Sequence, residues 1–263
     1  MVLKDNLIEL EIVDNIYIIT FQNKLTKSVT FDFLQRLENI IDFVIENKIS
    51  EKKFILLRGK NGYFNMGGDL KMFLEVYEDR DKEKLTKYAL YCIDIIDKIR
   101  NSYKYNTYII SLINGETRGG GFEAALSSQF IIGVKGNDIS LPETKMGFYP
   151  GMGAFEHLSK KIGVSSAKKM IISGYNFTTE DLYANNIIDY LIDTDTDKEV
   201  HKIIRRIEKD IDKYYSLLTI EDRIYPILKE DLIDSVLLWV DNIFNLKPNH
   251  IRIIKRIIYK QDK

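Results

Sequence analysis

The chain has 263 residues, of which 45% are apolar and 29% charged, a composition typical of a globular protein that can bury a sizeable core. Its formal net charge of −1 gives no electrostatic reason to expect binding to nucleic acid or to an anionic membrane. No apolar run reaches the roughly 18 residues of a membrane span, and the N-terminus lacks the pattern of a signal peptide. The single cysteine, Cys92, excludes an intrachain disulfide, which favours a cytoplasmic location and a buried core thiol.

Short apolar runs bounded by polar or glycine-containing segments predict β-strands along the first two thirds of the chain. In chain order the predicted strands span residues 8–13, 16–21, 54–57, 108–113, 130–134, 139–141 and, as a short strand or apolar crossover, 187–192. Asp14-Asn15 separates the first two runs, which is typical of a tight hairpin turn. The segment 58–70 is rich in glycine and asparagine and predicts a loop.

Apolar residues that recur every three or four positions predict helices. The predicted helices span residues 33–45, 82–100, 155–172, 179–186, 197–216, 229–245 and 248–260. Thr30 is a candidate N-cap of the first, Asp69 is a candidate cap after the loop, and Thr178 with Asp181 fits a capping box. Residues 71–81 are polar and give no clear pattern. Strands therefore alternate with helices up to about residue 150, and the last third is mostly helical.

The clearest chemical signal lies within residues 111–155. Three glycines, 119–121, follow an apolar run and precede FEAAL, which predicts a strand, a glycine turn and a helix. Glycine permits close approach of a ligand, and the first amides of a helix lack intrahelical partners and attract negative charge. Glu123 lies on the first turn of that helix, and Glu143 lies in a second polar turn, SLPET. The sequence therefore predicts an amide-lined hole beside two carboxylates, a candidate acid/base site.

Other kinds of site find no support in the sequence. His157, His201 and His250 are isolated, and neither HxxxH nor CxxC spacing occurs, so we expect no metal ion. The GGGFEA segment lacks the Lys-Ser/Thr pair of a P-loop, so we expect no nucleotide there.

Three stretches resemble, in order and spacing, the crotonase (enoyl-CoA hydratase/isomerase) superfamily: YFNMGGDL (63–70), NGETRGGGFEAAL (114–126) and LPETKMGFYPGMGAF (141–155). Within it, the chain is most similar to diffusible signal factor synthases, which make cis-2-unsaturated fatty acid signals in bacteria. FNMGGDL, the following DRDKEKLTKYALYC, GGGFEAALS, and LPE with PGMGAF carry that narrower likeness. The resemblance covers residues 54–155 and fades before residue 50 and after about residue 190.

The resemblance implies an α/β fold, the ClpP/crotonase-like spiral of ββα units with a helical C-terminal trimerisation segment. Residues 1–195 would form the crotonase core with the active site, and residues 196–263 the helical C-terminal segment of the same fold. It also implies assembly into a homotrimer or hexamer.

The site residues follow from the same resemblance. The backbone amides of Gly68 and Gly120 would form the oxyanion hole, and Glu123 and Glu143 would be the catalytic carboxylates. Glu143 is assigned as the base at the α-carbon and Glu123 as its partner at the hydroxyl or water. The candidate substrate-binding residues are Met66, Gly67, Met72, Phe148 and Met152, with Phe73 and Met146 as further candidates for the pocket wall.

The resemblance implies a synthase that dehydrates a 3-hydroxyacyl thioester and then hydrolyses the thioester to release the free acid, a lyase with thioesterase activity. The substrate would be carried by the phosphopantetheine of acyl carrier protein or by CoA, with no further cofactor, and a sensor protein is a candidate regulatory partner. Two alternatives stay open. An enoyl-CoA hydratase/isomerase of fatty acid metabolism would leave the thioester intact. A catalytically silent crotonase-fold protein would bind a regulator, although the two retained glutamates argue against it.

Overall fold

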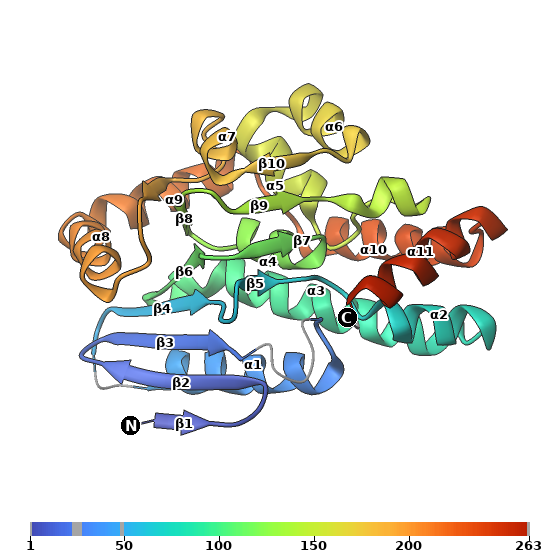
Figure 1. The fold of residues 1–263 in the computed structure, drawn as a ribbon. Coiled ribbons are helices and arrows are strands. Elements are labelled where there is room, and N and C mark those ends of the chain that lie inside the picture. Colours follow the sequence, from blue (N-terminus) through green and yellow to red (C-terminus); the bar gives the residue numbers. More distant parts are fainter. Residues whose placement is uncertain (1, 23–27, 48–49, 262–263) are drawn as a thin grey trace.

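Two β-sheets form the centre of the computed structural model, which describes residues 2–22, 28–47 and 50–261 (Figure 1). The larger sheet has the strand order β1 (Val2–Lys4), β2 (Ile8–Val13), β3 (Ile16–Phe21), β4 (Lys53–Arg58), β6 (Thr107–Ile113), β8 (Phe130–Val134) and β11 (Tyr190–Ile192). The smaller sheet has the order β10 (Asn176–Thr178), β9 (Asp138–Ser140), β7 (Glu116–Arg118) and β5 (Tyr63–Asn65). β1 to β3 pair antiparallel, whereas β3, β4, β6, β8 and β11 run parallel.

The chain alternates between the two sheets in a repeated unit. β4, β6 and β8 join the larger sheet, and the strands that follow them, β5, β7 and β9, join the smaller one. Each pair leads into helical structure: α2 (Leu70–Glu78) and α3 (Lys82–Asn101) after β5, α4 (Gly120–Leu126) after β7, and the 3-10 helix η2 (Pro142–Met146) with α5 (Ala154–Ile162) after β9. This succession is the spiral of ββα units that the sequence predicted.

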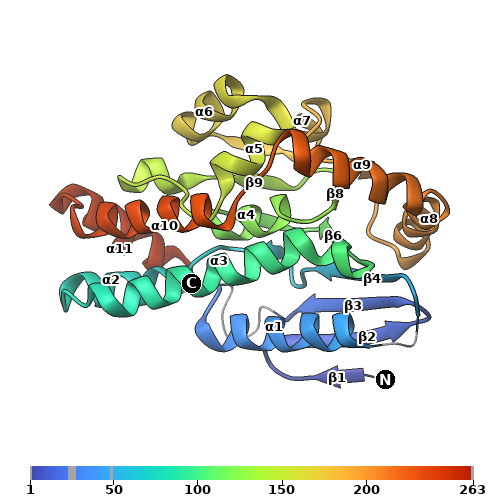
Figure 2. The same cartoon turned by 180° about the vertical axis from the view of Figure 1, so that it is seen from behind.

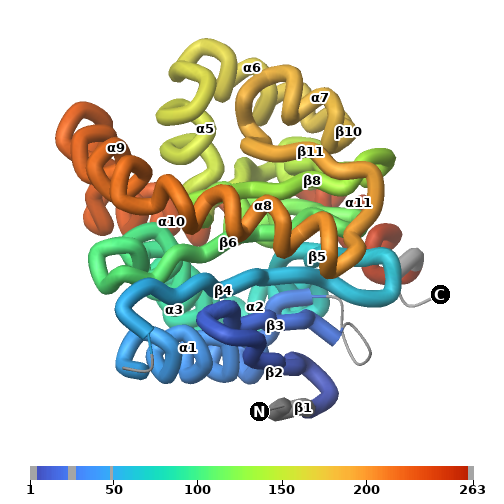
Figure 3. The backbone as a smooth tube through the Cα atoms, turned by 90° about the vertical axis from the view of Figure 1, so that its left-hand side faces the viewer, coloured from blue at the N-terminus to red at the C-terminus, as the bar shows by residue number. Residues whose placement is uncertain are grey.

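Helices cover both faces of the larger sheet. α1 (Phe31–Glu46) and α3 pack on one face, where Tyr17 and Ile19 of β3 are buried against them (Figure 2). α8 (Asp197–Lys209) crosses the opposite face and is buried against Ile16 and Ile18 of the same strand (Figure 3). Because successive side chains of a strand point to opposite faces, a sheet covered on both sides needs nearly continuous apolar strands, as the sequence has.

The predicted helix at 155–172 is wrong as a single element. Gly163, with φ +80°, separates α5 from α6 (Val164–Ser173), because a residue in that conformation cannot continue a right-handed helix. The predicted helix at 197–216 is likewise two helices, α8 and α9 (Ile211–Ile224), with Asp210 between them. The helical spacing of apolar residues continues across Asp210, since Ile207 and Ile211 belong to the same buried cluster.

Polar segments of uncertain pattern contain short elements that the sequence did not reveal, and β1 was also missed. β5 lies inside the predicted loop 58–70, and α2 occupies most of residues 71–81. The predicted caps are confirmed: Thr30 caps α1, Asp69 caps α2, and a capping box opens α7 (Thr179–Ala184).

The C-terminal helices return to the side of the molecule where α2 and α3 lie. From Asp197 onward every described element is a helix, and α10 (Lys229–Phe244) and α11 (Pro248–Gln261) follow α9. α10 packs along α3, and α11 packs against α2 and η2 (Figures 1 and 2). The division at residues 195/196 stays a prediction, and residues 1, 23–27, 48–49 and 262–263 lie outside the described residues. Of the helices described, none has both the length and the apolar character that a membrane crossing needs.

The close packing of α4 on β5 can be tested at one glycine. A Cβ atom on Gly121 would lie 2.5 Å from the Asn65 carbonyl oxygen and 2.7 Å from Asn65 Cβ. We therefore expect Gly121→Ala to lower the free energy of unfolding by about 1–3 kcal/mol, the usual cost of overpacking, measured by urea denaturation.

Gly120→Ala is the matched control for this substitution. The nearest atom to a Cβ on Gly120 is the Gly68 nitrogen at 3.6 Å, and the residue opens the helix. Its free energy of unfolding should stay within about 0.5 kcal/mol of the wild-type value. Equal losses in the two variants would contradict the packing argument.

Candidate active site

A cavity of about 420 Å³ lies between the smaller sheet, α1 to α4 and the C-terminal helices. Most of the sequence-derived site residues line it: Met66, Gly67, Gly68, Phe73, Gly120, Glu123, Glu143, Met146, Phe148 and Met152. Met72 is the exception and does not belong to the cavity wall. Its neighbour Phe73 faces the cavity, and one residue of helix turns the side chain about 100° away, so Met72 packs against the core elsewhere.

Two glycine turns from successive ββα units meet at this cavity. Gly67 and Gly119 have φ of +82° and +48°, a region that L side chains rarely adopt. A Cβ atom on Gly67 would lie 3.0 Å from the Gly120 nitrogen, so the turns are in direct contact. Neither the Gly68 amide nor the Gly120 amide donates a hydrogen bond to another described residue. Two such amides at one cavity can stabilise a negatively charged oxygen.

The surrounding protein fixes both turns. The Gly67 amide donates to Asn65 Oδ1 at 2.8 Å, and the Gly67 carbonyl accepts from the Val29 amide at 2.8 Å. The Gly119 amide donates to the Ser140 carbonyl at 2.9 Å. The sequence analysis missed the role of Asn65, although the residue belongs to the FNMGGDL motif. Because these bonds are made within the protein itself, they fix the positions of the amides of the next residues.

Glu123 projects from α4 and is buried. Its Oε1 atom accepts from the Met152 amide at 2.7 Å and from the Ala154 amide at 3.2 Å. The other oxygen, Oε2, would lie 3.9 Å from a Cβ on Gly120, so it faces the glycine turn. Burial, and then the nearby charge of Glu143, raise the pKa of Glu123 well above its usual range, although the two amides oppose this rise.

Glu143 comes from η2 and is also buried. Its Oε1 atom lies only 2.2 Å from the position of a Cβ on Gly119, so the carboxyl group fits there because residue 119 has no side chain. Within the described part of the chain, its Oε2 atom has no hydrogen-bond partner. Burial raises the pKa of Glu143 to about 7. The carboxyl group can therefore exchange a proton near neutral pH.

The cavity wall changes from polar to apolar across the carboxylates. Arg118 lies at the polar side, paired with Glu116 and donating to Ser140 Oγ at 2.8 Å. The sequence analysis also missed Trp239 of α10 and Ile257 of α11, which line the apolar side. No local motif marks them, because only the packing of the C-terminal helices brings them to the cavity. In the described ranges, no group of three or more His, Cys, Asp or Glu side chains is placed to hold a metal ion.

The chain matches one family model and several solved structures. The model described as "Enoyl-CoA hydratase/isomerase" matches residues 11–221. The enoyl-CoA hydratase of Bacillus halodurans superposes with a TM-score of 0.78 at 20% identity, over 94% of this chain and 98% of that chain. For the enoyl-CoA hydratase of Thermoplasma volcanium GSS1 the TM-score is 0.69 at 23% identity, over 96% and 97% of the two chains.

A third solved structure has a different description. The ECH2 decarboxylase domain of CurF from Lyngbya majuscula matches with a TM-score of 0.70 at 16% identity, over 96% of this chain and 99% of that chain. At sequence identities this low, a structural match shows that the fold is shared and shows nothing about activity. Together the matches confirm the crotonase fold that the sequence predicted.

The raised pKa of Glu143 predicts how stability depends on pH. A folded-state pKa of about 7, above the ordinary 4.5, means that protonation stabilises the fold. That contribution is complete below pH 4.5 and is lost as pH rises through about 7. The loss amounts to at most about 3 kcal/mol, since one pKa unit is 1.36 kcal/mol. In denaturation experiments from pH 5 to pH 8, Glu143→Gln should therefore lose less stability than the wild type.

The exposed Glu75 of α2 provides the control for this experiment. Glu75→Gln should follow the wild-type pH dependence. Parallel curves for wild type and Glu143→Gln would show that the carboxyl group of Glu143 is not perturbed by burial.

Proposed function

The chain belongs to the enoyl-CoA hydratase/isomerase family, and from this premise we propose that it is a synthase of a diffusible cis-2-unsaturated fatty acid signal. Its substrate is a 3-hydroxyacyl thioester of acyl carrier protein or CoA, and its product is the free acid. The observation that carries the proposal is the pair of buried carboxylates, Glu123 and Glu143, beside the amides of Gly68 and Gly120, which donate to no other described residue. The sequence likeness in FNMGGDL, GGGFEAALS and PGMGAF supports the choice of a signal synthase.

In the proposed first step, water is eliminated from the substrate. The Glu143 carboxylate takes the α-proton, and negative charge moves to the thioester oxygen. The amides of Gly68 and Gly120 stabilise that charge, and one such donor is typically worth roughly 3–4 kcal/mol. The protonated Glu123 gives its proton to the departing 3-hydroxyl group, which leaves as water while the double bond forms.

In the proposed second step, that water cleaves the thioester. After elimination Glu123 is ionised and Glu143 carries the α-proton. Glu123 takes a proton from the water as its oxygen attacks the thioester carbon, and the same two amides stabilise the tetrahedral oxyanion. The intermediate expels the thiolate, which receives the proton of Glu143. Both carboxyl groups return to their starting states, and the products are the enoic acid and the free thiol.

The environment of each carboxyl group supports this division of roles. Burial raises the pKa of both carboxyl groups, so the pair favours keeping a proton. The Oε1 atom of Glu123 is occupied by two amides, which leaves Oε2, on the side of the glycine turn, to carry the proton. The pKa of Glu143, about 7, suits a general base that works near neutral pH. Two neighbouring buried carboxyls also disfavour simultaneous ionisation.

An enoyl-CoA hydratase is the alternative with a specific observation behind it. The family model carries that description, as do the structures from Bacillus halodurans and Thermoplasma volcanium GSS1. Such an enzyme would use the same carboxylates and amides but would leave the thioester bond intact. A catalytically silent, regulator-binding protein is disfavoured, because it would have no need to keep two carboxyl groups buried at an energetic cost.

Product analysis tests the proposal. We expect the purified protein to convert 3-hydroxydodecanoyl carrier protein into a free 2-enoic acid, identified by mass spectrometry. Glu123→Gln, Glu143→Gln and Gly120→Ala should each lower the rate at least ~100-fold, because each removes a proton-transfer group or crowds the space beside an oxyanion donor. Glu75→Gln should retain the wild-type rate.

The outcomes separate the candidate functions. An enoyl thioester without free acid would assign the chain to the hydratase class. Absence of turnover on carrier-protein and CoA thioesters of every length tested would favour the silent protein. A cytoplasmic location and restraint by a sensor protein stay predictions.

We also propose that the chain assembles as a homotrimer or a hexamer. The supporting observation is an apolar stripe on α9, where Leu217, Ile220 and Ile224 are exposed on one side of the helix. Leu217→Glu combined with Ile224→Glu should yield monomers in light scattering, whereas Phe43→Glu on the exposed side of α1 should not. A wild-type protein that is monomeric at micromolar concentration would refute the assembly.

A further inference from the structure

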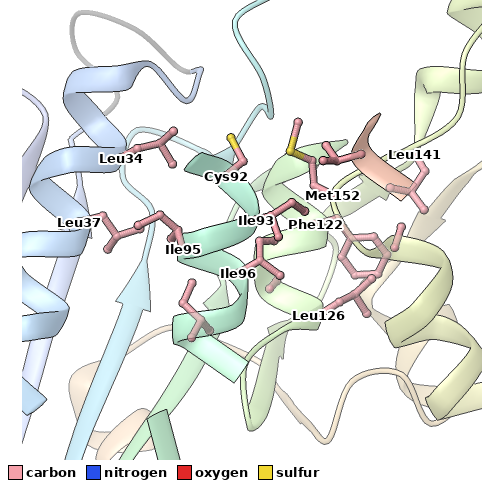
Figure 4. Packing of buried hydrophobic residues seen from close by; sticks show 14 of the residues in the cluster. Leu34, Leu37, Cys92, Ile93, Ile95, Ile96, Phe122, Leu126, Leu141 and Met152 are labelled. Atoms are coloured by element: carbon pink, nitrogen blue, oxygen red, sulfur yellow. The ribbon is translucent and has the colours of Figure 1, made fainter. Parts of the chain in front are cut away.

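The inner end of the cavity is an apolar chamber between α1 and α3. Four residues of α3 at helical spacing line it, and three residues of α1 face them: Cys92, Ile95, Ile96 and Ile99, with Phe33, Leu34 and Leu37. Figure 4 shows Leu34 and Leu37 pointing from α1 toward Ile95 and Cys92 on α3. Among the described residues, none with a charged side chain lines this part of the cavity wall, so the chamber suits a hydrocarbon.

The chamber begins at the carboxylates and ends two helical turns further on. Cys92 lines the cavity together with Met152, whose amide donates to Glu123, and Figure 4 shows both side chains. Along α3 the residues that line the cavity end at Ile99, which is fully buried. Along α1 they end at Leu37, since Ile41, one turn further on, does not line the cavity. Leu37 and Ile99 therefore mark the closed end of the chamber.

An apolar hollow of this kind is suited to an apolar ligand. Protein interiors are close-packed and contain few voids larger than a water molecule. A cavity without polar partners does not hold ordered water, but it binds apolar ligands. Cys92 and Ile99 are seven positions apart, which corresponds to about 10 Å along the helix, so the lining of the chamber extends about that far along α3.

We propose that this chamber receives the hydrocarbon end of a fatty-acyl chain and that Leu37 and Ile99, at its floor, limit the length of that chain. The orientation rests on the proposed function, which puts the thioester carbonyl at the amides of Gly68 and Gly120. From there the chain passes Cys92 and ends at the floor.

The chain contains its own reporter of occupancy. Trp239, the only tryptophan, lines the cavity and contacts the ring of Phe73 at 5.2 Å between centroids. Its fluorescence therefore reports binding without any turnover. Titration with saturated free fatty acids from octanoic to hexadecanoic acid should show affinity that rises with length and then falls at the length that meets the floor.

Substitutions at the floor should move this limit. Ile99→Ala should shift the tightest-binding acid to a longer member of the series, and Ile99→Val should do so to a smaller extent if the alanine variant fails to fold. Ile96→Phe, which fills the chamber, should shift the limit to a shorter acid. Ile93→Ala is the matched control, because Ile93 lies on the same helix and is fully buried but does not line the cavity. It should leave the length preference unchanged.

The results separate this inference from the proposed reaction. Two results would overturn the assignment of the floor. One is an affinity that keeps rising with chain length through hexadecanoic acid. The other is a preferred chain length that shifts equally in Ile93→Ala and Ile99→Ala. A limit that moves only with Ile99 and Ile96 would support it, even if no thioester were turned over. Turnover of thioesters without a length limit in binding would keep the reaction and reject the chamber.

Discussion

The contact between two glycine turns is the constraint on which the site depends. One turn follows β5 and the other follows β7, which are neighbouring parallel strands of the smaller sheet. A side chain on Gly67 would clash with the backbone of residues 118 and 120. The pairing of these strands therefore fixes how closely two backbone amides from separate ββα units can approach. The same lack of side chains admits Glu143 against Gly119. The absence of side chains at Gly67 and Gly119 thus determines both how close the two amides lie and where the Glu143 carboxylate sits.

Burial raises the pKa of both carboxyl groups at a cost in stability, and their hydrogen-bond partners distinguish them. Glu123 receives two backbone amides, whereas Glu143 Oε2 has no partner among the described residues, yet both have a raised pKa because they are withdrawn from water. A site that favours one shared proton at neutral pH contains an acid and a base together. The fold tolerates this arrangement because the backbone that holds Glu123 is the entry to α5, a buried segment that packs on α4.

Local patterns were sufficient to predict most strands, the caps and the glycine motif, because these features depend on residues close together in the sequence. The break at Asp210 could not be read from periodicity, since the buried residues Ile207 and Ile211 on its two sides belong to one cluster. The break at Gly163 follows from the backbone conformation of that glycine, and residues 163–166 are exposed. The glycine turn and the polar turn SLPET marked Glu123 and Glu143 as candidates, although their burial follows only from the packing. Trp239 reaches the cavity through the return of α10 over α3, and Met72 is excluded by its direction on α2. Both facts depend on tertiary packing.

The polar and apolar walls of the cavity suggest how one site could carry out both proposed reactions, elimination and thioester hydrolysis. A hydrocarbon chamber on one side of the carboxylates and the Arg118–Glu116 pair on the other would orient a thioester with its chain inward and its carrier outward. Elimination would then release water beside Glu123, in a space walled by apolar side chains. Under the proposed mechanism the hydrolytic water is the one just formed, so the cavity need not open to solvent between the steps. A dry site strengthens the interactions of the amide pair with both oxyanions. Exclusion of bulk water and hydrolysis of the thioester are therefore compatible in this fold.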